Sequence, residues 1–352
     1  MNKLFELRAK LTPWQSTVLG VLGLLFIVVL WWALAEYFSF TKTIDPDRLE
    51  LLDGEAPPQS EEKVYPILPT PMMVVRSFPD LLVKDDLKGN VLHSIWLNIR
   101  GYFWAVVISI PLGFLIGLIP LFRGMFSKPV DALRYLPLTA LTGLFIIWFG
   151  IEDEMKIAFL AFGILVYLLP VVVQRIDEVQ DVYLKTVFTL GATNWQTVKS
   201  VYLPSVLSKL IDDIRVLTAI SWTYIIIAEL LNRQGGIGAL IYLKARQGQI
   251  PKVFALLIVI VLIGFLQDRL FVYLDKRLFP FKYYKTTLTA LREIRVGLLI
   301  LFAIMAVAIL LQIYLPEFSS TLSMSIWTVA LAAVALMLFG EFKIRSSTTE
   351  SA

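Results

Sequence analysis

Residues 16–32 read STVLGVLGLLFIVVLWW, an uncharged apolar run that by itself indicates the class of fold. A second uncharged run, GYFWAVVISIPLGFLIGLIPLF, occupies residues 101–122. An α-helix needs about 20 such residues to cross the hydrocarbon layer of a membrane. Because a helix that is apolar on every side is stable only inside a large protein core or a membrane, both runs predict transmembrane helices.

The composition of the whole chain supports a membrane protein. Hydrophobic residues make up 57% of the 352 residues and charged residues 17%, whereas soluble domains carry about 25% charged residues. The charges also fall between the apolar stretches. We therefore predict an all-α integral membrane protein whose eight spans lie at about residues 15–37, 93–121, 130–150, 155–174, 210–231, 253–274, 295–315 and 321–340.

Several kinds of chemistry are excluded by residues that the sequence lacks. There is no cysteine and His93 is the one histidine, so we predict no thiol chemistry, no catalytic triad, no metal site and no cofactor. No GxxxxGK[ST] motif is present to bind nucleotide phosphates. The net charge of +4 fits basic residues that flank membrane helices, and we expect lipid and no nucleic acid as a partner. The first apolar run ends in Trp31 and Trp32, which favours a retained anchor over a cleaved signal peptide.

The basic residues predict the orientation in the membrane, because they concentrate in cytoplasmic links. With both termini in the cytoplasm, most basic links lie inside, and link 232–252 with its four basic residues is the exception. The basic residues that then face the cytoplasm between spans are Arg123, Lys128, Arg134, Arg175, Lys185, Lys199, Lys209, Lys276, Arg277, Lys282, Lys285, Arg292 and Arg295.

The polar segments predict the division of the chain. The acidic, turn-rich stretch 42–63 should be a loosely ordered external loop. Thr70 and Pro71 then have the residue types of an N-cap and first helical position, before an amphipathic helix that either lies on the membrane surface or packs under a loop. The expected parts are an N-terminal anchor (1–37), the external segment (38–91), a core (92–285), a C-terminal hairpin (286–340) and a cytoplasmic tail (341–352).

The cytoplasmic link between spans four and five has an unusual pattern. Residues 181–190 can form a short helix that Gly191 interrupts, and Thr193 or Asn194 can cap a second helix over 195–202. We expect Leu203-Pro204 to end that second helix. Such a link is either a rigid knob for a soluble partner or an ordinary interhelical loop.

The stretch LKTVFTLGATNWQTVKSVYLP, residues 184–204, resembles the EAA loop of ABC importer permeases. In that pattern Gly191, Val201 and Leu203-Pro204 match at the expected spacing, whereas Lys185-Thr186-Val187 replaces the EAA triplet and its acid. Further stretches resemble the sulfonate, taurine, nitrate and bicarbonate branch: LPTP at 68–71, Arg100, ALRYLPLTAL at 132–141, IIWFGI at 146–151, IIAELL at 226–231 and GGIGAL at 235–240.

The resemblance covers about residues 15–285, and the last two spans lie outside the usual six-helix plan of the family. It implies a permease of the bacterial inner membrane that is not itself an enzyme. The implied partners are a second permease copy, two cytoplasmic ABC ATPase subunits and an external solute-binding protein. The implied solute is small and in most members anionic, such as a sulfonate, nitrate or bicarbonate, although some members carry neutral heterocycles. The implied ATPase-docking residues are Lys185, Thr186, Val187, Gly191, Val201, Leu203 and Pro204.

Two other functions remain open from the sequence: a membrane scaffold or sensor that keeps the permease fold, and a polytopic membrane enzyme. The sequence disfavours the enzyme, because no cluster of His, Cys or carboxylates lies within the spans.

Charged residues inside spans are costly and are therefore candidates for function. The candidates for a translocation path, each of which could also serve structure, are Arg100, Trp148, Arg215, Trp222 and Glu229. Glu229 could instead pair with Arg233 one turn later, the arginines could extend to the membrane surface, and the tryptophans could pack or anchor. We also expect an ion pair between Asp268 and Arg269.

Overall fold

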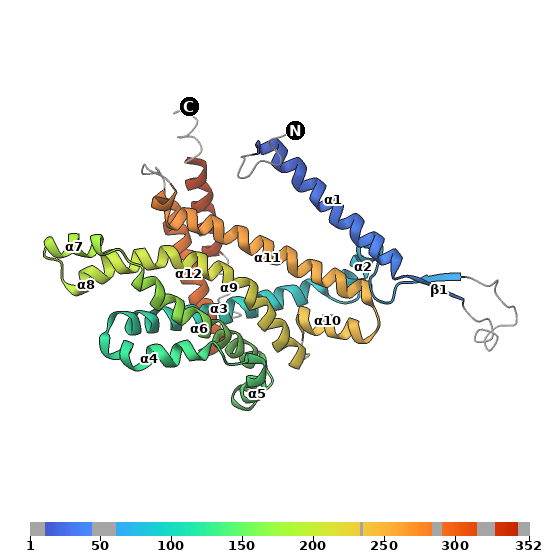
Figure 1. Ribbon diagram of the computed structural model, residues 1–352, viewed down its shortest axis with the longest axis horizontal. Helices are drawn as coiled ribbons and strands as arrows, with labels where there is room; N and C mark the ends of the chain where they lie inside the picture. Colours follow the sequence, from blue (N-terminus) through green and yellow to red (C-terminus); the bar gives the residue numbers. More distant parts are fainter. Residues whose placement is uncertain (1–10, 44–60, 233–234, 284–290, 315–327, 344–352) are drawn as a thin grey trace. The chain divides into compact units, whose positions relative to one another are not determined.

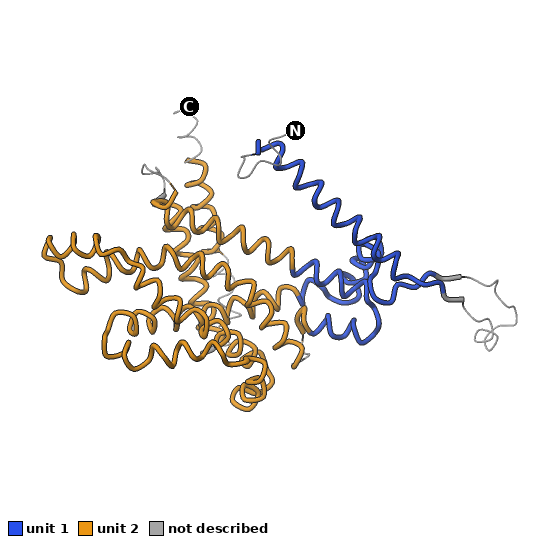
Figure 2. The backbone as a smooth tube through the Cα atoms, viewed as in Figure 1, with its two compact units in different colours: residues 1–90, 239–260 blue, residues 91–238, 261–352 orange. Residues whose placement is uncertain are grey.

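A computed structural model describes residues 11–43, 61–232, 235–283, 291–314 and 328–343, and these are almost entirely helical (Figure 1). Within these residues six helices are long and apolar enough to cross a membrane, which confirms the predicted all-α membrane fold. They are Pro13–Tyr37, Leu87–Leu118, Asp153–Asp177, Asn194–Leu231, Ile250–Leu278 and Arg292–Gln312. The chain divides into two compact units, residues 1–90 with 239–260 and residues 91–238 with 261–352, shown in two colours in Figure 2.

The first unit begins with α1 (Pro13–Tyr37), which starts at a capping box formed by Thr12 and Gln15. Ala35 is the buried residue of this helix, and most of its other apolar side chains are exposed. A helix exposed in this way is suited to lipid rather than to water. Trp31 lies near its end and donates from Nε1 to the carbonyl oxygen of Pro69 at 2.9 Å.

After α1 the chain forms a two-stranded antiparallel ribbon, in which β1 (Phe40–Thr43) pairs with β2 (Glu61–Val64). Residues 42–63 were expected to be a loose loop, and the two strands correct that expectation at its ends, while residues 44–60 lie outside the described part. Glu36 near the end of α1 holds the second strand close to the first. Its carboxylate binds Lys63 and accepts from the Tyr65 hydroxyl at 3.1 Å.

Helix α2 (Pro71–Val83) begins as predicted, with the Thr70 side chain accepting from the N–H of Met73. Val74 and Leu81 on one face are buried within the first unit. The Ser77 hydroxyl also contacts the carbonyl oxygen of Pro251 at 3.4 Å. These contacts show that α2 packs on other helices of its unit along this face.

In the second unit α3 (Leu87–Leu118) packs parallel to α6 (Asp153–Asp177) along a stripe of small residues at every fourth position: Gly101, Ala105, Ser109, Gly113 and Gly117. A Cβ atom on Gly101, Gly113 or Gly117 would lie within 2.6 Å of Leu160, Val172 or Ile176, and 59 residues separate the members of each pair. Small residues let membrane helices approach closely, so this stripe brings α3 and α6 together.

Helix α9 (Leu203–Asn232) runs antiparallel to α3, and polar groups join the two. Ser94 contacts Glu229 at 2.5 Å, Asn98 donates to the Ser221 hydroxyl at 3.0 Å, and the Tyr102 hydroxyl donates to a carbonyl oxygen of α9 at 2.7 Å. Buried polar groups must find partners inside the protein where no water reaches them. The three contacts therefore fix the register between the two helices.

The predicted span over 130–150 is not one continuous helix. The chain forms α4 (Pro120–Leu133), then η3 (Leu138–Leu141) and α5 (Thr142–Phe149), with a bend of 95° between α4 and the η3–α5 pair. Pro137 explains the break, because proline lacks an N–H and disfavours helical backbone in the residue before it. Gly150, with φ +77°, then ends α5.

The remaining elements are α10 (Ile237–Arg246), α11 (Ile250–Leu278), η5 (Pro280–Lys282), α12 (Leu291–Tyr314) and a helical stretch over 328–343. The predicted eighth span, 321–340, falls only partly within the described residues. The last stretch contacts the end of α11, where Glu341 accepts from Tyr273 at 2.9 Å and from Arg277 at 2.6 Å. In α12 a Cβ on Gly297 would lie 2.5 Å from Met337, so the two C-terminal helices also pack closely together.

Candidate functional site

The link between α6 and α9 forms two short helices, as the sequence predicts. These are α7 (Asp181–Thr189) and α8 (Asn194–Thr197). Gly191 has φ +73°, and its N–H and that of Ala192 donate to the carbonyl oxygens of Phe188 and Val187. These are the two bonds of a Schellman turn, which requires a left-handed residue at the glycine position. Thr193 and Gln196 then form a reciprocal capping box at the start of α8.

The helix that follows does not end at Leu203-Pro204, so that prediction is wrong. A π-helical turn over Val198–Tyr202 leads directly into α9, and the Leu203 N–H donates to the carbonyl oxygen of Val198. Pro204 lies at the second position of α9 and, because proline has no N–H, donates no hydrogen bond to the preceding turn. The wider turn lets the helix continue past the proline, so the link is joined rigidly to the span.

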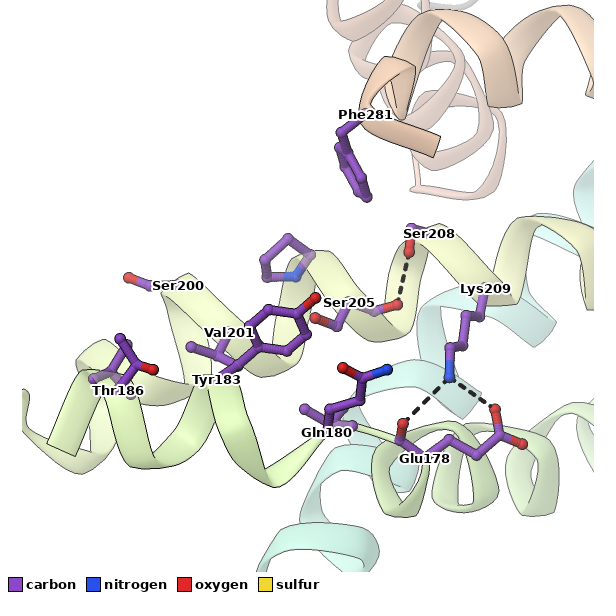
Figure 3. Close-up of a pocket in the computed structure, with 13 residues that line it drawn as sticks. Glu178, Gln180, Tyr183, Thr186, Ser200, Val201, Ser205, Ser208, Lys209 and Phe281 are labelled. Atoms are coloured by element: carbon purple, nitrogen blue, oxygen red, sulfur yellow. Dashed lines mark hydrogen bonds and ion pairs between the residues drawn. The ribbon is translucent and has the colours of Figure 1, made fainter. Parts of the chain in front are cut away.

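A pocket of about 520 Å³ lies among the residues after α6, helix α7, the π-helical turn, the start of α9 and η5 (Figure 3). Four of the seven predicted docking residues line it: Thr186, Val187, Val201 and Pro204. The rest of the lining includes the apolar Val179 and Phe281 and the hydrogen-bonding groups of Gln180, Tyr183, Ser200, Ser205 and Ser208. No sequence pattern indicates this pocket, because its walls come from segments up to about a hundred residues apart.

The two charged residues of the lining, Glu178 and Lys209, neutralise each other. Lys209 Nζ lies 3.0 Å from Glu178 Oε2, and Arg175 donates to the same carboxylate at 2.7 Å. The hydrogen bonds from Arg175 and Lys209 lower the pKa of Glu178, so the carboxylate stays ionised near neutral pH. The pocket therefore presents no unpaired charge to a phosphate or another small ion, and it is suited to an uncharged, partly apolar group.

The link also exposes large apolar side chains outside the predicted membrane spans. Val182, Phe188, Leu190 and Trp195 are each more than half exposed, and Leu190 reaches 79%. Large apolar side chains exposed within one short link are candidates for a surface that binds another protein. We call residues 181–204 the knob; its pocket and exposed side chains form a surface suited to a protein partner.

Two of the residues predicted for a translocation path lie on open surfaces of the described chain, and three lie inside it. Trp148 is 65% exposed, and the Arg215 side chain is partly open. Arg100 and Trp222 are buried, and Trp222 Nε1 donates to the Gln267 side chain at 2.6 Å. The third buried residue is Glu229. The structure does not gather the five on one surface of this chain.

The expected pair between Asp268 and Arg269 is wrong. Asp268 binds Arg215 of α9, with Arg215 Nη2 at 3.0 Å from Asp268 Oδ2, and Arg269 lies over the ring of Phe265 at 5.0 Å. Adjacent residues on a helix point in different directions, so a neighbouring helix supplies the partner of Asp268 instead.

Glu229 has partners that the sequence did not indicate. Its carboxylate accepts from the Gly238 N–H at 2.7 Å and from the Ser94 hydroxyl, which in turn accepts from the Ile237 N–H at 2.8 Å. A Cβ on Gly236 would overlap the carboxylate, so glycine is needed there. The alternative partner Arg233 lies outside the described residues. The GGIG run at 235–238 was the one available signal, because it allows a close approach of backbone to side chain.

Comparison with known proteins shows similarity to membrane components of transport systems. Residues 109–280 match the family described as "Binding-protein-dependent transport system inner membrane component". A Bacillus subtilis (strain 168) protein named as an aliphatic sulfonates transport permease is 30% identical over 220 residues, which cover 61% of this chain and 78% of that protein.

Two further relatives are similar over a comparable share of the chain. The taurine transport system permease protein of Escherichia coli (strain K12) is 27% identical over 60% of this chain and 79% of its own length. The formylaminopyrimidine transport permease protein of Halalkalibacterium halodurans is 25% identical over 61% of this chain and 86% of its own length. With its helical membrane fold and this extent of similarity, the chain belongs to the family of binding-protein-dependent transport system inner membrane components.

Proposed function

We propose that this chain is the membrane-spanning permease subunit of an ABC importer that carries a small anionic solute into the cell. The three relatives named above are all transport permeases, which favours transport over the scaffold or sensor alternative. Two of them are named for sulfonates or taurine, which are anionic or carry an anionic group, and one for a neutral heterocycle. An anionic solute is therefore the first substrate class to test.

ATP is hydrolysed, in this proposal, by two separate ATPase subunits that dock on the knob. Support comes from the exposed apolar residues of the knob and from its neutral pocket, because both suit a protein surface and neither suits a nucleotide. The absence of a phosphate-binding GxxxxGK[ST] motif from the sequence agrees with this division of labour. A second copy of the chain and an external solute-binding protein complete the proposed complex.

The proposed orientation places both termini and the knob in the cytoplasm of a bacterial inner-membrane protein. It is supported by the basic links, which would otherwise lie almost entirely outside. It also puts the protein-binding surface of the knob on the side where ATP is available.

The test of docking is a change of Gly191 to valine. A Cβ at this position would meet nothing within 4 Å, so the effect of the change comes from φ +73°, which a β-branched residue resists. We expect Gly191→Val to reduce copurification of the ATPase encoded beside the permease by about tenfold, which corresponds to about 1.4 kcal/mol. Uptake of radiolabelled taurine by cells should fall in parallel, while the amount of permease in the membrane should stay the same.

The matched control is Gly191→Asn, because asparagine tolerates left-handed backbone better than other non-glycine residues. It should retain most of the ATPase binding. Normal copurification of the ATPase with Gly191→Val would exclude the knob as the docking element.

A further inference from the structure

We propose that residues 279–283, which directly follow α11, form a second contact element for the ATPase, so that one partner surface touches both α9 and the end of α11. This inference rests on the proposed docking function of the knob. The exposed Phe281 makes the contact, and Lys282 is the positioning residue that holds it beside the pocket.

Lys282 bridges two helices of the same unit. Its Nζ donates to the carbonyl oxygen of Ser208 at 2.8 Å and to the carboxylates of Asp212 at 3.0 Å and Asp275 at 2.9 Å. Ser208 and Asp212 belong to α9, whereas Asp275 belongs to α11. An ammonium group has three N–H donors, and these acceptors can satisfy all of them.

The Lys282 side chain stays protonated near neutral pH. Burial alone would lower its pKa, but hydrogen bonds to Asp275 and Asp212 outweigh burial and raise the pKa above its ordinary value. Asp275 is itself buried, accepts from the Tyr283 hydroxyl, and through its carbonyl oxygen accepts from the Phe279 N–H at 2.9 Å. Residues 279–283 are thus tied on both sides of Phe281, and their position relative to α9 is set by side-chain contacts.

These contacts hold Phe281 at the edge of the pocket. The residue is 62% exposed, and it lines the pocket together with residues of α7 and the start of α9 (Figure 3). It lies beyond Leu278, where the candidate membrane span of α11 ends. Aromatic residues, including phenylalanine, are enriched in protein interfaces, so Phe281 is suited to contact a protein partner.

The chemistry of the pocket indicates what enters it. Thr186 and Val187 of the knob share the lining with Phe281, so a group that fills the pocket touches both. Because Lys209 is already bound to Glu178, an anion gains no free positive charge there. The fitting occupant is an uncharged, partly apolar segment of the ATPase surface. Through it, movements of the ATPase would reach α9 and α11 together.

The absence of cysteine from the chain gives a direct test. Single variants Phe281→Cys, Thr186→Cys and Phe342→Cys are labelled with biotin maleimide, each with and without the copurified ATPase, and labelling is read on the permease band. Thr186 reports the knob, and Phe342, 71% exposed in the last helical stretch, is the control for an open position away from the pocket.

We expect the ATPase to slow labelling at positions 281 and 186 by about tenfold, since the core of a protein interface excludes water, and to leave position 342 unchanged. Lys282→Met is then added to the Phe281→Cys and to the Thr186→Cys proteins. We expect it to remove most of the protection at position 281 and little of the protection at position 186. Lys282→Arg should restore part of it.

The outcomes separate the two proposals. If position 186 is protected while position 281 stays fully reactive, this inference is overturned and docking on the knob stands. If both positions stay reactive, docking on the knob is itself wrong. Protection at 281 that Lys282→Met leaves unchanged would overturn the positioning role of Lys282.

Discussion

Glu229 shows how neighbouring polar groups can accommodate a buried carboxyl group within the membrane part of a protein. Its side chain is fully buried, and a charged group at the centre of a membrane helix costs about 2.5–3.5 kcal/mol without compensation. The compensation here comes from the Ser94 hydroxyl and from the N–H of Gly238 at the start of α10. Glu229 thereby binds the first turn of α10 and the side chain of Ser94.

We predict that Glu229→Ala lowers the melting temperature of the purified protein clearly more than Glu229→Gln. Alanine leaves the Gly238 N–H and the O–H of Ser94 without acceptors, at about 1–3 kcal/mol for each buried donor. Glutamine keeps an oxygen that can accept from Gly238 and an amide that can donate to Ser94. Thermal unfolding followed by size-exclusion chromatography measures the difference, with the exposed Glu152→Ala as control. Equal melting temperatures for the alanine and glutamine variants would contradict this role.

At the residue level, local patterns predicted the caps correctly and missed the long-range pairs. Thr70, Thr193 and Gly191 act within a few residues of their own position, so their roles can be read from neighbouring letters. The partner of Asp268 lies 53 residues away in another helix, and no local pattern carries that information.

At the level of elements, the contact between α3 and α6 rests on three glycines. The sequence marks α3 as a membrane helix because it is apolar, yet the apolar run alone does not show which side faces another helix. The stripe becomes visible once Val172 is found against Gly113, where an added Cβ would overlap the valine side chain.

We predict that Gly113→Leu destabilises the protein, whereas Gly264→Leu does not. At Gly113 a larger side chain must push α3 away from α6, and such overpacking costs typically about 1–3 kcal/mol. Gly264 is a helical glycine of α11 where an added Cβ would meet nothing within 4 Å, so leucine can extend outward. The melting temperatures of both variants in the same detergent provide the comparison. If the two match, the close packing at Gly113 does not contribute to stability.

At the level of the whole molecule, the chain joins a permease core to C-terminal helices that lie beyond residues 109–280, the part matched by the family. Contacts from Glu341 to Tyr273 and Arg277 attach these helices to the end of α11. The Trp96 side chain of α3 also donates to Gln312 of α12 at 3.0 Å. These contacts include no residue that lines the pocket.

We predict that ending the chain after Lys285 leaves ATPase activity of the reconstituted complex within about twofold of the full-length protein, because the truncation keeps the knob and residues 279–283 while removing only helices that support α11. The melting temperature should fall, since Arg277 loses its carboxylate partner. Activity in proteoliposomes and thermal unfolding are measured on the same preparation. A truncated protein that assembles with the ATPase but no longer hydrolyses ATP or transports would place the C-terminal helices in the mechanism.

The sequence alone determined the class of the protein and the local structure of the knob. Long uncharged runs cannot be accommodated in water, so the membrane fold follows from composition and order. The helix–glycine–helix pattern of the knob likewise follows from caps and turns that depend on residues within one or two helical turns.

Only the tertiary structure decided which distant groups meet. The segment over 130–150 is bent instead of forming one helix, and the helix continues through Pro204 into α9. Asp268 pairs with Arg215 and not with Arg269. The tertiary structure also brought Phe281 to the pocket of the knob through Lys282. All of these differences have the same physical reason. A buried polar group bonds to, and a helix face packs against, whatever group the packing of helices places beside it. That neighbour is set by the fold as a whole and not by adjacent residues.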